Sequence, residues 1–171
     1  QKAIDMAKPG IKISQIAAEI MKLQAIDGTY TGIPPMISVN DNSGHMNWNN
    51  SKLKIGDFVR IELSGAYLYY NCPLSRTIFI GNREIIKKTI YHDSESVQKI
   101  LELAFINIIE TIENNDIITA ETIHNAFINI INKYGIIKTS RIGYSFGIGF
   151  PPEWQDGGIY SIRTNNSETI L

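Results

Sequence analysis

The sequence has 171 residues, of which 43% are hydrophobic and 19% are charged. That length suits a domain with a buried core, and the apolar content excludes wholesale disorder. The net charge of -1 argues against a dedicated nucleic-acid-binding or anionic-membrane protein, and the single cysteine excludes an internal disulfide. Apolar runs are too short and interrupted to cross a membrane. We therefore expect a cytoplasmic protein with no nucleic-acid and no membrane partner.

The first 50 residues predict two helices and one short strand. Residues 1–8 resemble the end of a helix that Pro9-Gly10 stops. Apolar residues then recur at helical spacing, which predicts a helix from Ser14, as its N-cap, to about Ala25. The stretch that follows, up to residue 50, is rich in Gly, Pro, Asn and Ser. It predicts loops around a strand at residues 36–39.

The middle of the sequence predicts β-structure. Apolar and polar residues alternate over residues 57–64, which is typical of a strand with one apolar and one charged face. Ser64-Gly65-Ala66 predicts a turn into a second strand at residues 67–71. Pro73 then predicts an interruption before a third strand at residues 77–80.

Two amphipathic helices are predicted next. The first has Asp93 or Ser94 as its cap, and the second runs from the cap Thr119 to Gly135. The remainder of the chain is rich in glycine and proline. We expect His124, on the second of these helices, to be solvated.

Three polar segments could carry chemistry. His45, in a loop, could shuttle protons near neutral pH, or it could be an ordinary surface histidine. Glu62 lies in mid-strand, where a carboxylate needs either a ligand or a partner, and Arg60 on the same face could be that partner. The glycines of residues 141–154 could let the backbone closely approach a ligand or another strand, or they could form a tightly packed turn.

The order of the motifs along the chain is similar to that of a known protein family. His45 is followed by the turn Lys54-Ile55-Gly56-Asp57, by Glu62 in mid-strand, by an aromatic strand ending at Arg76-Thr77, and by the glycine-rich residues 143–149. This order resembles the creatinase/aminopeptidase P family, which has the pita-bread fold. The resemblance implies an α+β architecture with an antiparallel curved sheet and flanking helices.

The resemblance also implies what surrounds the chain. Residues 1–171 are expected to be an incomplete catalytic domain, without the N-terminal domain and the closing C-terminal strands. We expect the isolated chain to be inactive, and the full-length protein to be a homodimer that acts on a small-molecule substrate.

The family's metal ligands are replaced in this sequence. Peptidases of the family hold two metal ions with two Asp, one His and two Glu. The two Asp positions correspond to Glu62 and Pro73, the His position to Tyr144, and the two Glu positions fall beyond Leu171. Proline has no side-chain donor, and a neutral phenol is a poor ligand for hard divalent ions. We therefore expect no metal and no other cofactor.

What remains looks closest to the metal-free branch of the family, and to ectoine hydrolases in particular. The resemblance implies a metal-independent hydrolase that breaks a C–N bond in a small cyclic amidine or guanidino compound. His45 and Glu62 are the expected catalytic residues, with Glu62 either holding the cationic substrate or acting as nucleophile. The expected substrate-binding residues are Tyr144, Arg76, Tyr69 and Glu153.

Two other functions stay open. One is an Xaa-Pro aminopeptidase or dipeptidase, which would require a divalent metal such as Mn or Co. The other is a pita-bread module that binds a partner without catalysis.

Overall fold

The computed structural model describes residues 1–26, 34–40, 47–88, 94–148 and 161–164. His45 and Glu153 therefore lie outside the described residues. The chain divides into two compact units. We call Gln1–His92 with Phe146–Trp154 the sheet unit, and Asp93–Ser145 with Gln155–Leu171 the helix unit. Within the described ranges, no helix is long and apolar enough to cross a membrane.

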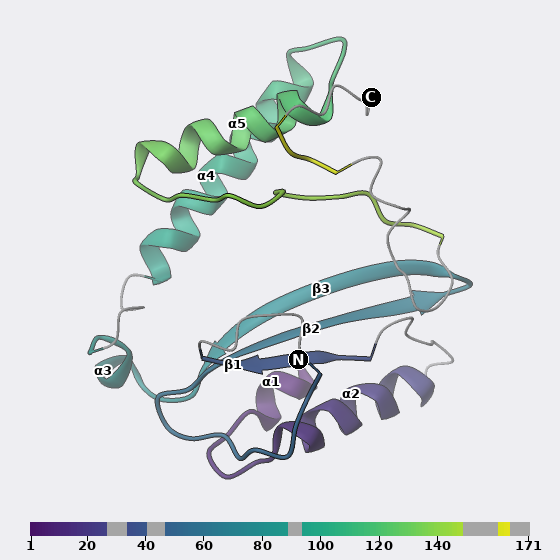
Figure 1. Cartoon of the computed structure of the whole chain (residues 1–171), viewed down its shortest axis with the longest axis vertical. Coiled ribbons are helices and arrows are strands. Elements are labelled where there is room, and N and C mark those ends of the chain that lie inside the picture. The colour runs from purple at the N-terminus through teal and green to yellow at the C-terminus, as the bar shows by residue number, and fades with distance from the viewer. Residues whose placement is uncertain (27–33, 41–46, 89–93, 149–160, 165–171) are drawn as a thin grey trace. The chain divides into compact units, whose positions relative to one another are not determined.

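The sheet unit is a three-stranded antiparallel sheet with helices. Its strands lie in the order β1-β2-β3, and α1 and α2 lie on one side of the sheet (Figure 1). The elements of this unit are α1 (Lys2–Met6), α2 (Ile13–Ile26), β1 (Met36–Val39), β2 (Phe58–Tyr67), β3 (Tyr70–Phe79) and α3 (Arg83–Ile86). The predicted strand at residues 36–39 is confirmed. Ser14 is not the N-cap of α2, because the helix begins one residue earlier.

The core of the sheet unit lies between α2 and one face of the sheet. Strand register pairs Ile37 with Ile61 and Val59 with Ile78, so these side chains share a face. They belong to one apolar cluster with four residues of α2, namely Ile13, Ile16, Ala17 and Ile20. The opposite face of the sheet carries polar side chains together with the apolar Met36, Phe58 and Ala66.

The predicted turn at Ser64-Gly65-Ala66 is wrong. β2 runs through these residues to Tyr67, and the chain reverses at Leu68 and Tyr69, which have φ values of 49° and 69°. Two-residue hairpins of this kind require positive φ at both positions, and Gly or Asn is the usual sequence signal. Leu-Tyr does not give that signal, so the sequence pattern points instead to a turn at Gly65, three residues before Leu68.

Pro73 does not interrupt β3 either. The backbone N–H of Asn71 donates to the carbonyl of Gly147 at 2.8 Å, on the side of β3 that faces away from β2. Position 73, two residues on, directs its nitrogen to the same outer side. The missing N–H of the proline therefore costs no hydrogen bond to β2.

The start of β2 is held by the turn at residues 54–57. Gly56 has φ +94°, a conformation that favours glycine. The Asp57 carboxylate accepts from the Lys54 backbone N–H at 2.7 Å and from Asn40 Nδ2 at 3.0 Å. The Asn40 side chain accepts from the backbone N–H of Phe58 at 2.9 Å, so the end of β1 is tied to the start of β2. This network fixes the register that places the polar face.

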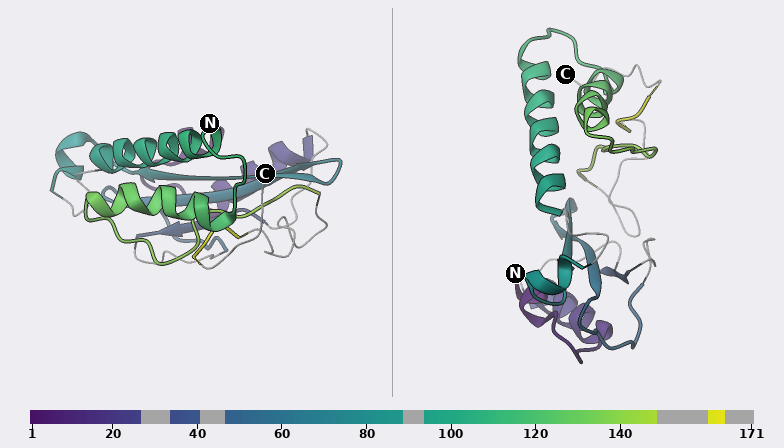
Figure 2. Two further views of the ribbon diagram at one scale, coloured as in Figure 1. Left: turned by 90° about the horizontal axis from the view of Figure 1, so that it is seen from above. Right: turned by 90° about the vertical axis from the view of Figure 1, so that its left-hand side faces the viewer.

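The helix unit is built on α4 (Ser94–Glu113) and α5 (Ala120–Lys133), which pack side by side (Figure 2). The predicted cap Thr119 is confirmed, because its hydroxyl accepts from the backbone N–H of Thr122 at 3.1 Å. Gly135, at φ +73°, ends the helix as expected. The expectation of a solvated His124 is wrong, since that side chain is buried.

Candidate active site

The polar face of the sheet gathers the buried polar side chains of the sheet unit. Among the described residues of that unit, the buried polar side chains are Ser38, Glu62, Ser64 and Asn71. The register pairs Ser38 with Arg60, Ser64 with Pro73, and Asn71 with Ala66, so all four side chains point away from α2. Polar groups are buried at a cost unless they are paired or bind something. We therefore define the polar face by these four residues and treat it as the candidate site.

Glu62 is the only acidic residue on this described face. Its side chain forms an ion pair with the guanidinium of Arg60, two residues away on the same strand. Glu62 is 8% exposed, whereas the Arg60 side chain keeps about a third of its surface in solvent, at 36%. The alternative in which Arg60 is the partner of Glu62 is therefore confirmed. Such a pair offsets the desolvation of the carboxylate through charge-assisted hydrogen bonds.

The described side chains near Glu62 do not have the donors of a two-metal centre. On β3, Ser75 pairs directly with Glu62, and Pro73 is the diagonal neighbour on the same face. Pro73 has no side-chain donor, and one oxygen of Glu62 is already engaged by Arg60. Across the part of the chain that the structure describes, no three His, Cys, Asp or Glu side chains come together as metal ligands do.

Asn71 ties the polar face to a distant segment of the chain. Its backbone N–H and its Nδ2 both donate to the carbonyl of Gly147, at 2.8 and 3.3 Å, and Nδ2 also donates to the carbonyl of Tyr69 at 3.2 Å. An isolated antiparallel bridge joins Tyr70 to Ile148. Gly147 and Ile148, within the predicted glycine-rich stretch, therefore lie along the outer edge of β3.

The other predicted site residues lie elsewhere. Arg76 pairs with Ile61 and so belongs to the opposite face of the sheet from Glu62, with its Nη1 donating to the carbonyl of Ser75 at 2.7 Å. Tyr69 is in the hairpin turn and is 46% exposed. Tyr144 is in the helix unit, where the Arg141 guanidinium stacks 4.4 Å from its ring centroid. Within the sheet unit, the structure thus places neither Arg76 nor Tyr69 on the strand face of Glu62.

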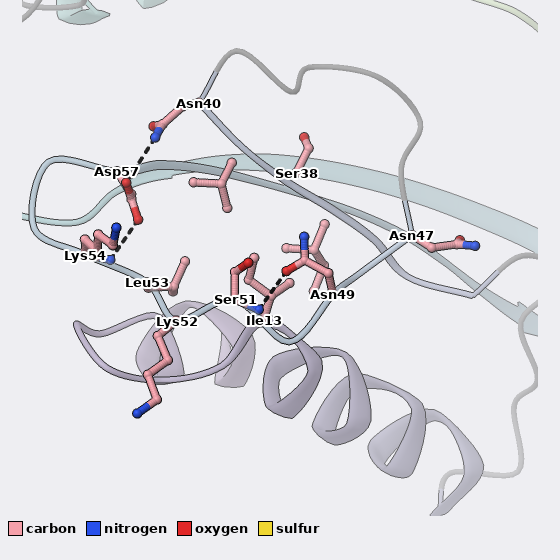
Figure 3. A pocket seen from close by; sticks show the side chains of 12 residues that line it. Ile13, Ser38, Asn40, Asn47, Asn49, Ser51, Lys52, Leu53, Lys54 and Asp57 are labelled. Carbon is pink, nitrogen blue, oxygen red and sulfur yellow. Dashed lines mark hydrogen bonds between the residues drawn. The ribbon is translucent and has the colours of Figure 1, made fainter.

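A cavity of about 360 Å³ opens at the β1 side of the sheet unit (Figure 3). Twelve residues line it, among them the polar residues Ser38, Asn40, Asn47, Asn49, Ser51, Lys52, Lys54 and Asp57. Most of its polar groups are neutral amides and hydroxyls, and the carboxylate of Asp57 is already held by Lys54 and Asn40. Ser38 is common to this cavity and to the polar face, while Glu62 does not line the cavity.

The sequence pattern placed Ser64 on the charged face of the predicted strand, but sequence reasoning missed Ser38 and Asn71 as members of the polar face. Ser64 shares the alternation of Arg60 and Glu62 along β2, so that signal was present in the sequence. Asn71 becomes visible only once the hairpin is placed correctly, because its pairing with Ala66 depends on the turn at Leu68 and Tyr69.

The comparisons with known proteins agree with this architecture. The family described as "Metallopeptidase family M24" matches residues 1–171. An ectoine hydrolase of Halomonas elongata is 27% identical over 188 residues, which cover 99% of this chain and 43% of that protein. A Xaa-Pro dipeptidase of Pyrococcus horikoshii is 26% identical over 156 residues, covering 89% of this chain and 42% of that protein. The chain thus spans less than half the length of these relatives.

Solved structures share the fold. The prolidase from Pyrococcus furiosus aligns with a TM-score of 0.74 at 21% identity, over 99% of this chain and 49% of that one. The expected pita-bread architecture, an antiparallel sheet with flanking helices, is confirmed.

Proposed function

We propose a hydrolase function for this chain, which belongs to metallopeptidase family M24. In our proposal the protein hydrolyses a C–N bond of a small cyclic amidine or guanidino compound without a metal ion, as an ectoine hydrolase-like enzyme. The relative from Halomonas elongata supports the substrate class. The observation that carries the proposal is the register that sets Pro73, which has no donor, diagonal to Glu62 on one sheet face.

The charge of Glu62 suits an amidinium. This cation is planar and presents N–H groups in a fork, so a carboxylate can hold it through two charge-assisted hydrogen bonds. Burial of Glu62 to 8% exposure strengthens such an interaction relative to water. The alternative role, attack by Glu62 on the amidine carbon, uses the same carboxylate and stays open.

The remaining steps need a proton carrier. In the proposal His45 removes a proton from the attacking water, the water oxygen bonds to the amidine carbon, and the C–N bond breaks as the nitrogen takes up the proton. Tyr144 orients the substrate or stabilises the developing charge. We keep Arg76, Tyr69 and Glu153 as proposed substrate contacts. Arg76 lies on the opposite sheet face from Glu62, so its contact would have to be made away from that carboxylate.

Arg60 adds a condition to this mechanism. It already occupies the Glu62 carboxylate, so a cationic substrate must displace or share that guanidinium. Since the Arg60 side chain is 36% exposed, it can move into solvent at modest cost. A neutral substrate would gain nothing from such an exchange, which favours a cationic substrate class.

The decisive experiment is an activity assay of the full-length protein on ectoine and on creatine, with and without a chelator. We expect turnover of at least one of these compounds to persist in the chelator. Loss of turnover in the chelator, with recovery on adding Mn or Co, would contradict the metal-independent proposal.

The Xaa-Pro peptidase is the second candidate, favoured by the dipeptidase from Pyrococcus horikoshii among the relatives. It predicts metal-dependent hydrolysis of Xaa-Pro dipeptides, together with bound metal in elemental analysis of the purified protein. The non-catalytic module is the third candidate. It predicts that Glu62→Gln and His45→Ala both leave the biological role intact.

A further inference from the structure

The helix unit contains a second cavity, also of about 360 Å³. The described residues that line it all carry a side-chain N–H or O–H group and none carries a carboxylate: His124, Thr139, Ser140, Arg141, Ser161, Arg163 and Thr164. Two of them are guanidinium groups, which stay charged at every physiological pH. A described lining in which every side chain can donate, two are permanently cationic and none is anionic suits an anion.

A short antiparallel pairing builds this cavity. The backbone N–H of Ile142 donates to the carbonyl of Ile162 at 2.9 Å, and the N–H of Ile162 donates to the carbonyl of Gly143 at 2.9 Å. A Cβ atom on Gly143 would come within 3.1 Å of the Ile162 side chain, so the close approach favours glycine there. The pairing brings residues 139–141 beside residues 161–164, although they are about 20 residues apart in sequence.

Arg141 is held in place before any ligand arrives. Its guanidinium stacks on the ring of Tyr144 at 4.4 Å, and its Nη1 donates to Ser161 Oγ at 3.2 Å. Stacking uses the face of the guanidinium and leaves most of the N–H groups at its edge. A positioned arginine of this kind loses little freedom when it binds an oxyanion.

The second guanidinium, that of Arg163, is exposed and has no counter-charge among the described residues. Within the described ranges, Arg163 makes no ion pair or hydrogen bond, and Arg141 has no carboxylate partner. Two positive charges that share one cavity repel each other unless an anion lies between them. The cavity floor is polar as well, because His124 and Ser161 are only 8% and 3% exposed.

We propose that this cavity binds a phosphate group. A phosphate has several acceptor oxygens in a tetrahedral arrangement, so it can accept from two guanidinium groups and from hydroxyls on different sides. A carboxylate has only two oxygens and would leave more of these donors unsatisfied. The volume exceeds that of inorganic phosphate, so a small organic phosphate also fits. The cavity includes no residue of the polar face; its link to the proposed hydrolase function is Tyr144, on which Arg141 stacks.

The test is calorimetric titration of the full-length protein with inorganic phosphate, and with acetate and chloride at matched ionic strength. Phosphate is expected to bind with one site and more tightly than acetate. Arg163→Gln and Arg141→Gln should each weaken phosphate binding at least about tenfold, as expected for the loss of a charge-assisted contact. Phenyl phosphate binding more tightly than inorganic phosphate would identify an organic phosphate as the source.

Lys133→Gln is the matched control. Lys133 is exposed and lies in the same unit, but it does not line the cavity, so its loss removes the same charge without touching the site. Its phosphate affinity should stay within about twofold of the unchanged protein, since distant surface charges are screened by salt. The proposal is overturned by absence of phosphate binding, by equal binding of acetate, or by equal weakening in Lys133→Gln and Arg163→Gln.

Discussion

The two units of this protein differ in whether their site arginines have a carboxylate partner. In the sheet unit, Arg60 is paired with Glu62 on the same strand, and the polar face is locally neutral. In the helix unit, Arg141 and Arg163 line one cavity whose described lining contains no carboxylate. A charge that is satisfied inside the fold must be displaced before a ligand can bind, whereas an unsatisfied charge attracts a ligand directly. The first arrangement is suited to exchange of cations and the second to capture of anions.

The largest expected effect concerns the acid of the polar face. Glu62→Gln keeps the size of the side chain and one acceptor oxygen but removes the negative charge. It should lower kcat/KM for the cyclic amidine or guanidino substrate by at least about a hundredfold, in line with losses of acid-base or charge-stabilising groups. Glu84→Gln, at an exposed position of α3, is the control and should leave activity unchanged. Equal activity in the two variants would remove Glu62 from the site.

The next prediction concerns the separate cores of the two units. Ile16 is 0% exposed in the core of the sheet unit, and Ile131 is 1% exposed in the core of the helix unit. The two residues belong to different apolar clusters. Ile16→Ala and Ile131→Ala should each lower the free energy of unfolding by about 2–5 kcal/mol, measured by urea denaturation. Because the side chains share no cluster, their effects should add to within about 0.5 kcal/mol.

The exposed residues Ile55 and Ile137 provide controls, at 64% and 84% exposure. Their alanine variants should stay within about 0.5 kcal/mol of the unchanged protein. Strong non-additivity of the two buried variants would show that the cores are coupled.

A smaller effect is expected when the ion pair of Arg60 with Glu62 is removed. Arg60→Gln removes the internal competitor for Glu62, so KM for a cationic substrate should fall by about two- to fivefold, the range expected for a partly exposed ion pair. Arg83→Gln, which removes an exposed arginine at the start of α3, should leave KM unchanged. A rise in KM for Arg60→Gln would show that Arg60 assists substrate binding instead.

The smallest expected effect concerns the hairpin that joins β2 to β3. Leu68 has φ 49°, which asparagine tolerates better than leucine. Leu68→Asn should therefore raise the free energy of unfolding by up to about 1 kcal/mol, measured by urea denaturation. Leu74→Asn removes another exposed leucine, at 47% against 71% for Leu68, from strand backbone and should give no such gain.

Much of the fold could be predicted because it rests on periodic patterns. The alternation around Val59 and Ile61 gave the buried face of β2, and Thr119 gave the start of α5. The hairpin failed because tertiary structure imposed positive φ on two residues that rarely adopt it. His124 was misread as solvated although Ala120, Ile123 and Phe127 around it form the buried stripe at helical spacing.

The candidate site was harder to predict than the fold. Glu62 and its partner Arg60 follow from alternation along one strand, which is local information. Whether Arg76 shares their face depends on the pairing between strands, and that pairing depends on the turn that was misplaced. A shift of one residue in strand register moves every side chain to the other face, so a site built across strands is sensitive to it.

The attachment of Gly147 to Asn71 has a consequence for synthesis of the chain. The carbonyl that covers this part of the β3 edge belongs to a residue 76 positions later, after the whole of α4 and α5. At translation rates of roughly 5–20 residues per second, this edge of β3 stays unpaired for about 4–15 s until Gly147 is synthesised. Nascent chains translated side by side on one messenger could pair through that open edge. Early packing of α5 on α4 would shorten the flexible chain between Asn71 and Gly147. The entropy cost of bringing Gly147 to the β3 edge would then be smaller.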